Sequence, residues 1–326
     1  TPTLKNVNIK NNTSVGSVMN LNLGGAVNMT DVTFDGNNVS QAQTSGETNA
    51  VVAVLTNGFN GDINGLTINN PSSVNNVVIQ KTNDTNDTTS AGTFTIKNAN
   101  ITGGGSAFAF SKIESVNIGT LGENGNEGKV GLVASGCSGD VLKVKNAKNF
   151  TLYNSNIGNL ETNDIYSRGI YLNTVSSGTI KNVTVYNCKA EAGVSGAGLY
   201  MTGSTITMNN CNFTGNVAGE NGGNGGAVYM SGGSLTIKNS TFDSNGTDDS
   251  SENGGFGGAI YAASGTLTID DQSVVTFRNN HASKGGAIYL ESGATLAKQK
   301  INKTTEFISN SAAYDGGAIY SKNSLT

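Results

Sequence analysis

The side chains that could support catalysis are few and scattered. Asp270-Asp271 is the best acidic pair, Asp164 lies near Arg168, and His281 is the single histidine of the 326-residue chain. Cleavage of a polysaccharide needs two acids at a controlled separation, or a base together with Ca²⁺ and a cation. Adjacent residues on a strand point to opposite faces, so the two aspartates would not act on one bond, and Asp is common in turns for backbone reasons. We therefore expect no catalytic residue and no enzyme, with Arg168 a solvated side chain.

A second group of acidic residues could bind a hard cation. Its members are Asp243, Asp248, Asp249 and Glu252. Carboxylate oxygens suit Ca²⁺, but this spacing matches neither an EF-hand nor a GGxGxD calcium roll. We expect a solvated acidic loop and no metal or cofactor, with these four residues as the candidates should Ca²⁺ bind.

The three cysteines offer no framework for a metal site or for disulfides. Cys137, Cys188 and Cys211 are too few and too irregularly spaced for either. We expect small, buried, apolar side chains. Cys188 and Cys211 could pair only if they lay on facing turns.

The overall charge excludes two classes of partner. The net charge is −4, and the chain has two arginines, Arg168 and Arg278, and no lysine-rich patch. Electrostatic binding of nucleic acid or of anionic lipid is therefore not expected. No apolar run is long enough to cross a membrane, so direct membrane insertion is not expected either.

One motif recurs through the second half of the chain and must position any functional side chain. Its copies are Gly225-Gly226-Ala227-Val228-Tyr229, Gly257-Gly258-Ala259-Ile260-Tyr261, Gly285-Gly286-Ala287-Ile288-Tyr289 and Gly316-Gly317-Ala318-Ile319-Tyr320, with weaker copies ending at Tyr171 and Tyr200. Successive tyrosines lie 28 to 32 residues apart. This period is typical of a solenoid.

Two further runs follow each copy. The first resembles Leu235-Thr236-Ile237, and the second is F-x-x-N, found at Phe213 to Asn216, Phe242 to Asn245, Phe277 to Asn280 and Phe307 to Asn310. Three short strands per period, separated by turns, predict one coil of a three-sided β-helix. Equivalent side chains should then stack about 4.8 Å apart, with Asn amide ladders at the bends. In this alignment His281 takes the place of Val217 and Ser311.

The paired glycines have two possible explanations. At a corner of the coil they would supply positive φ or a close backbone approach. A phosphate-binding loop is the alternative, but no helix follows the motif and no Lys occupies the expected place. We therefore expect a structural role.

The first half follows the same pattern less strictly. Residues 51–55, 66–68 and 77–79, for example, are assigned to one coil. No linker or change in composition marks a domain boundary. We predict one all-β, right-handed, single-stranded parallel β-helix over residues 1–326, irregular over 1–168 and regular over 169–326. It would have three strands per coil and about twelve coils.

The half from Gly169 to Tyr320 resembles the repeats of chlamydial polymorphic outer-membrane proteins and related adhesin-like β-helices. The shared hallmark is GGA[ILV] alternating with F-x-x-N. In the first half, Phe34 to Asn37 and Gly24-Gly25-Ala26-Val27 are isolated echoes. The resemblance implies surface display, often as an autotransporter passenger, and adhesion to cells.

These features predict a non-enzymatic, secreted or cell-surface protein that binds a receptor or glycan. A polysaccharide-binding or polysaccharide-cleaving β-helix, like pectate lyases and polygalacturonases, is one alternative. Another is a fibre subunit that stacks head to tail on identical copies. The candidate assembly ends are Leu4, Val7, Ile9, Tyr320 and Leu325. A fragment excised from a longer passenger would carry the same ends.

Overall fold

The computed structural model describes most of the chain as β-strands and turns. It covers residues 3–23, 26–40, 49–56, 58–81, 92–122, 128–159, 168–248, 251–252, 254–270, 272–296 and 305–323. Of the residues named above, Gly24, Gly25, Asp164, Asp249, Asp271 and Leu325 lie outside these ranges. The chain divides into two compact units, Thr1–Ile157 and Gly158–Thr326, here termed the N-terminal and C-terminal units.

The predicted fold class is confirmed. The pairings between described strands are parallel, and the described residues contain no α-helix. The architecture is a right-handed parallel β-helix of about nine turns, with about 29 residues in each. The prediction of twelve coils was therefore too high. None of the described segments is a helix that could span a membrane.

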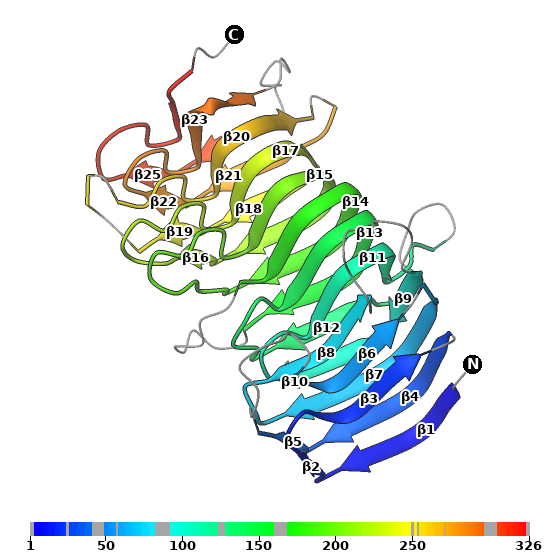
Figure 1. Cartoon of the computed structure of the whole chain (residues 1–326). Coiled ribbons are helices and arrows are strands. Elements are labelled where there is room, and N and C mark those ends of the chain that lie inside the picture. The colour runs from blue at the N-terminus through cyan, green and yellow to red at the C-terminus, as the bar shows by residue number, and fades with distance from the viewer. Residues whose placement is uncertain are drawn as a thin grey trace. The chain divides into compact units, whose positions relative to one another are not determined.

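In the C-terminal unit, each turn carries its tyrosine near the start of a strand, and these strands lie side by side (Figure 1). They are β14 (Ile170–Tyr186), β15 (Leu199–Thr214), β17 (Val228–Lys238), β20 (Ile260–Ile269), β23 (Ile288–Leu296) and β26 (Ile319–Ser321). In β15 the phenylalanine run continues the same strand. In later turns it forms the separate strands β18 (Thr241–Asp243), β21 (Val275–Arg278) and β24 (Thr305–Ile308).

A short strand follows the asparagine of each F-x-x-N motif. These strands, β16 (Val217–Ala218), β19 (Gly246–Thr247), β22 (His281–Ala282) and β25 (Ser311–Ala312), form a separate four-stranded sheet (Figure 1). The sequence did not reveal them because two residues are too few to show an alternation of apolar and polar positions.

The core of the C-terminal unit consists of columns of inward side chains. Strand alternation places Val228 and Met230 inside, fully buried, and Tyr229 between them on the opposite face. The phenylalanine rings stack from turn to turn, with centroids 5.4 Å apart for Phe213 and Phe242 and 4.9 Å apart for Phe242 and Phe277. Each turn is therefore held to the next by matched apolar contacts.

An amide ladder lies beside the phenylalanine column. Asn216 Nδ2 donates to Asn245 Oδ1 (2.9 Å), Asn245 donates to Asn280 (3.0 Å), and Asn280 donates to Asn310 (2.8 Å). Each amide also donates to a backbone carbonyl of the preceding turn, as Asn245 does to Phe213 (2.9 Å). These bonds satisfy side chains that are almost completely buried, which explains why the motif requires Asn.

The N-terminal unit is built from two parallel series of strands and shorter pieces. One series is β1 (Thr3–Lys10), β4 (Val27–Asp35), β7 (Gly61–Asn70) and β9 (Thr93–Lys97), and the other is β3 (Ser17–Leu23), β6 (Ala50–Thr56), β8 (Asn75–Lys81), β11 (Phe108–Ile118) and β13 (Leu142–Gly158). The remaining strands are β2 (Thr13–Ser14), β5 (Asn38–Val39), β10 (Ala99–Gly103) and β12 (Leu132–Ser135).

The predicted grouping of runs in this unit was wrong. β6 pairs with β8, so that Val52 lies beside Val77 and Val54 beside Ile79. Residues 51–55 and 77–79 therefore occupy equivalent places in successive turns, and they do not belong to one turn. Assigning equivalent runs to the same coil misplaces the turn boundaries in this half of the chain.

Candidate functional site

The most regular outward feature of the C-terminal unit is a column of six tyrosines, which we call the tyrosine ladder. Its members are Tyr171, Tyr200, Tyr229, Tyr261, Tyr289 and Tyr320, and each is the register partner of the next. Successive ring centroids are 5.3, 4.9, 5.4, 5.3 and 4.9 Å apart, with interplanar angles of 2 to 21°. The rings therefore cover one another's faces and present their edges and hydroxyls outward.

The ladder is not equally accessible along its length. Tyr171, Tyr200, Tyr229 and Tyr320 are partly exposed, whereas Tyr261 is 9% and Tyr289 2% exposed. Phe256 contributes to the burial of Tyr289 by stacking on it, with centroids 4.7 Å apart. The accessible surface is therefore best developed over the first three turns.

The glycine motif makes the corner from which the ladder strands start. In the second full copy, Gly257 has φ +67°, and a Cβ there would collide with the carbonyl oxygen of Ile260. A Cβ on Gly258 would meet the carbonyl oxygen of Gly286 in the next turn. The first glycine thus provides the left-handed conformation and the second the close backbone approach, so both proposed reasons apply.

Charged groups lie against the two ends of the ladder. The Arg168 guanidinium is 4.9 Å from the ring centroid of Tyr171 and 5.0 Å from that of Tyr200. The prediction that Arg168 is merely solvated was wrong, since it is partly buried in cation–π contact with two rings. Its partners come from the following turn as well as its own, which the local sequence does not show.

At the other end, Glu291 connects the ladder to Lys322. Lys322 Nζ lies 2.8 Å from Glu291 Oε1, and the Tyr261 hydroxyl donates to the same oxygen (3.3 Å). Burial would raise the pKa of Glu291, but the hydrogen bond from Lys322 holds it below its usual value. Burial and the adjacent carboxylate raise the pKa of Tyr261, so its hydroxyl stays protonated at neutral pH.

The acidic candidates for a cation site are paired with cations on other turns. Arg278 Nη2 lies 2.8 Å from Asp243 Oδ2, Lys189 Nζ 3.1 Å from Asp248, and Lys284 Nζ 4.0 Å from Glu252. Where the structure describes the chain, it contains no group of three potential metal ligands. Asp243, Asp248 and Glu252 are therefore not brought together.

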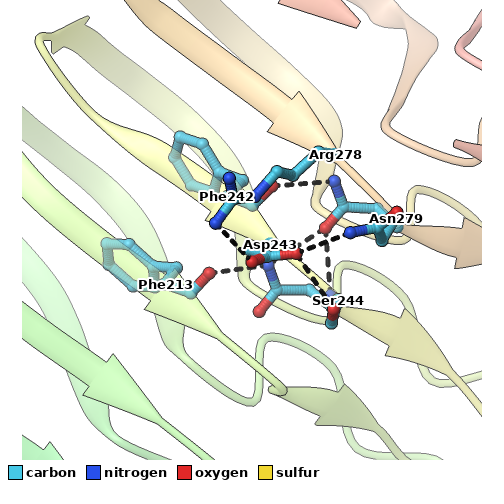
Figure 2. A network of polar contacts seen from close by, with 8 residues as sticks. Phe213, Phe242, Asp243, Ser244, Arg278 and Asn279 are labelled. Atoms are coloured by element: carbon cyan, nitrogen blue, oxygen red, sulfur yellow. Dashed lines mark hydrogen bonds and ion pairs between the residues drawn. The ribbon is translucent and has the colours of Figure 1, made fainter. Parts of the chain in front are cut away.

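Figure 2 shows the most developed of these networks, on the face next to the phenylalanine column. Besides Arg278, Asp243 accepts hydrogen bonds from Asn279 Nδ2 (3.1 Å) and Ser244 Oγ (2.9 Å). Burial opposes ionisation, but the hydrogen bonds from Arg278, Asn279 and Ser244 lower the pKa of this carboxyl. The network joins two turns and leaves the carboxylate committed to an ion pair.

The catalytic candidates are also separated. Asp270 lies 3.8 Å from Lys238 of the preceding turn, while Asp271 and Asp164 lie outside the described residues. His281 is exposed on β22, with Gly246 and Ser311 as its register partners, which is the column predicted from the repeat. No described contact joins His281 to Asp270.

The cysteines are buried and unpaired. All three thiols are free, so Cys188 and Cys211 form no disulfide. Burial raises the pKa of Cys137 and of Cys211 to about 12. Because the thiolate is the nucleophile, these side chains are unsuited to catalysis.

The predicted assembly ends lie at opposite ends of the described chain. Leu4, Val7 and Ile9 are half-buried on β1 and pair with β4. Tyr320 is the last ring of the ladder, and Leu325 lies outside the described residues. Their role in assembly stays a prediction.

The geometry of these turns agrees with a comparison against protein families. The model of the right-handed beta helix region matches residues 144–325, which is more than half of the chain. The chain belongs to the right-handed β-helix family. The match to this β-helix includes every copy of the glycine motif and all six tyrosines of the ladder. No curated protein and no solved structure matches the chain.

Proposed function

We propose that this right-handed β-helix is a non-enzymatic, secreted or cell-surface protein that binds its partner through the tyrosine ladder. The observation that carries the proposal is the ladder itself, in which equivalent aromatic residues of six turns point outward and four remain partly exposed. Tyrosine supplies a large, rigid contact area at a low cost in conformational entropy, which is why it is enriched where proteins bind partners.

The sequence motifs themselves say little about the partner. In GGA[ILV] and F-x-x-N, the glycines make a corner, and the phenylalanine and asparagine lie in the interior. These residues maintain the solenoid, whereas the tyrosine is the part of the repeat that reaches the surface. The resemblance to chlamydial polymorphic outer-membrane repeats supports an adhesin-like passenger, and the ladder supports the face that it would use.

Adhesion can be tested with the full chain labelled with a fluorophore and applied to intact cells. The variant Tyr171→Ala/Tyr200→Ala/Tyr229→Ala is expected to bind about tenfold to a hundredfold less, because contact residues of this kind dominate binding. Thr207→Ala/Thr236→Ala is the matched control, since it removes outward side chains from two of the neighbouring ladder strands. Equal loss in both variants, or in neither, would contradict the proposed face.

Polysaccharide cleavage remains the alternative chemistry for this fold. The described carboxylates discussed above are engaged with cations, which supports the non-enzymatic assignment. Incubation of the protein with a panel of acidic polysaccharides tests it directly. Turnover that is abolished by Asp270→Ala or Asp271→Ala would overturn the assignment.

Fibre formation is a second candidate because the amide ladders have a direction. Asn12 donates to Asn37 in one unit and Asn216 to Asn245 in the other, so in both cases the earlier turn is the donor. Polarity of this kind is what head-to-tail stacking requires. Sizing of the purified protein across concentrations checks the idea, and a strict monomer at high concentration would exclude it.

A further inference from the structure

We propose that the tyrosine ladder binds an uncharged, extended β-linked polysaccharide whose chain runs along the C-terminal unit, with one sugar over each turn. The inference rests on the proposed function, since it names the ligand class of the same face. It commits to a straight glycan chain and to the partly exposed part of the ladder, formed by Tyr171, Tyr200 and Tyr229.

The spacing of the ladder supports this occupant. Its ring centroids follow one another at 5.3 and 4.9 Å over these three turns, a period imposed by strand pairing. A fully extended β-1,4-linked hexose chain advances by nearly the same distance per sugar. Equivalent hydroxyls of successive sugars can therefore meet equivalent tyrosines without strain in either partner. A coiled α-linked glycan lacks such a straight repeat.

The orientation of the rings decides how such a chain would be recognised. Because each ring covers the face of the next, no inner face is open for a sugar to stack on. The exposed groups are ring edges and hydroxyls. Recognition would then depend on hydrogen bonds between hydroxyls, with the ring edges providing apolar contact, and it would require several turns to act together.

A second polar column runs beside the tyrosines on the same strands. Asn173, Thr202 and Ser231 lie two residues beyond Tyr171, Tyr200 and Tyr229 and are register partners of one another. All three are partly exposed, and Asn173 Nδ2 donates to the Tyr171 hydroxyl (3.3 Å). The two columns together form an array, two groups wide, of hydroxyls and an amide that repeats with the turns.

The charge of this array favours a neutral ligand. Neither column contains an ionisable group other than the tyrosines, and burial together with the neighbouring rings raises the pKa of Tyr200. The hydroxyls therefore remain neutral donors and acceptors at physiological pH. Carboxylates of an acidic glycan would lose hydration over the array without gaining an opposite charge from it.

The test is co-sedimentation of the full chain with microcrystalline cellulose, chitin beads and insoluble β-mannan, with starch granules and insoluble pectate as comparison probes. We expect binding to at least one of the β-linked probes and little to the comparison probes. Tyr171→Phe/Tyr200→Phe/Tyr229→Phe keeps the ring stack and removes the hydroxyls, so binding should fall about tenfold to a hundredfold.

Tyr289→Phe is the matched control, because it makes the same change at a ladder position that is only 2% exposed. Binding that survives the triple variant, or stronger binding to starch or pectate, would overturn the inference. Failure to sediment with any β-linked probe would also overturn it. If cell binding still depends on the ladder in that case, the proposed function stands and only its ligand class is wrong.

Discussion

The two units solve the same packing problem with different regularity. In the C-terminal unit the position between two inward residues is tyrosine in six successive turns. In the N-terminal unit the corresponding column contains Ala53, Val78 and Ala109, which are 1%, 2% and 7% exposed. Both arrangements support a β-helix, so the core alone does not require a ladder. The outward tyrosines are a property added to one unit, which is why we place the binding face there.

The same contrast extends to the interior. Phe242 is stacked between two other phenylalanines, whereas Phe34 has Ile9 and Ile68 as its register partners. Identical residues in successive turns give a column in which each ring fits its neighbours. Mixed residues bury as much apolar surface without that match. The substitutions below test whether the regular column is also the more stable one.

The largest effect is expected from Phe242→Ala. It should lower the free energy of unfolding by about 4 kcal/mol, since it opens a cavity in a fully buried column. Phe34→Ala should cost about 1 kcal/mol less, because no aromatic stacking is lost there. Urea denaturation followed by far-UV circular dichroism measures both. Equal costs would show that stacking adds nothing beyond burial.

Asn245→Ala should have the next largest effect, about 3 kcal/mol, because it leaves buried donors and acceptors on both adjacent turns without partners. Asn37 makes the same bonds to Asn12 and to the Ile9 carbonyl, but its described bonds include no further amide. Asn37→Ala should therefore cost about 1 kcal/mol less. Chemical denaturation measures both.

Asn210→Ala is the control for the asparagine substitutions. This residue donates to Asn182 (2.9 Å) at an exposed corner, so its loss should cost less than about 0.5 kcal/mol. A cost comparable to that of Asn245→Ala would mean that burial does not govern the strength of the ladder.

The smallest effect concerns Asp243 and pH. Its pKa is lower in the folded chain than in the unfolded chain, so the stability it contributes is present above about pH 4 and is lost as the pH falls through the folded pKa. Asp243→Asn should remove this dependence, which we expect to be below about 1 kcal/mol. Denaturation midpoints measured between neutral and acidic pH provide the check.

Asp35→Asn in the N-terminal unit is the comparison for this experiment. It breaks the exposed pair with Lys10 (3.7 Å), so it should change stability by less than about 0.5 kcal/mol. A larger pH dependence for Asp35→Asn than for Asp243→Asn would argue against the role of the hydrogen bonds around Asp243.

The accuracy of the sequence-based prediction follows the same division between the units. Repeated glycines, tyrosines and asparagines defined the register of the C-terminal turns, because each occupies a place that few other residues can fill. In the N-terminal unit the runs at residues 51–55 and 77–79 are both short and aliphatic. Nothing in such residues distinguishes equivalent strands of successive turns from strands of the same turn.

The candidate site could be predicted only in part. The repeat identified the tyrosines but left open whether they or their neighbours face inward. The contact of Arg168 with Tyr200 joins different turns, as does that of Asp243 with Arg278. Pairings of this kind depend on the exact length of each turn, which the spacing of motifs gives only to within a few residues.

The amide ladder has a mechanical consequence for a protein held at a surface. Its hydrogen bonds run from one turn to the next, so tension along the axis would load them in series and the end turn would detach first. Each detachment would release about 29 residues, which is about 100 Å of extended chain. Such a protein would lengthen in discrete steps under force and dissipate the load before its remaining turns gave way.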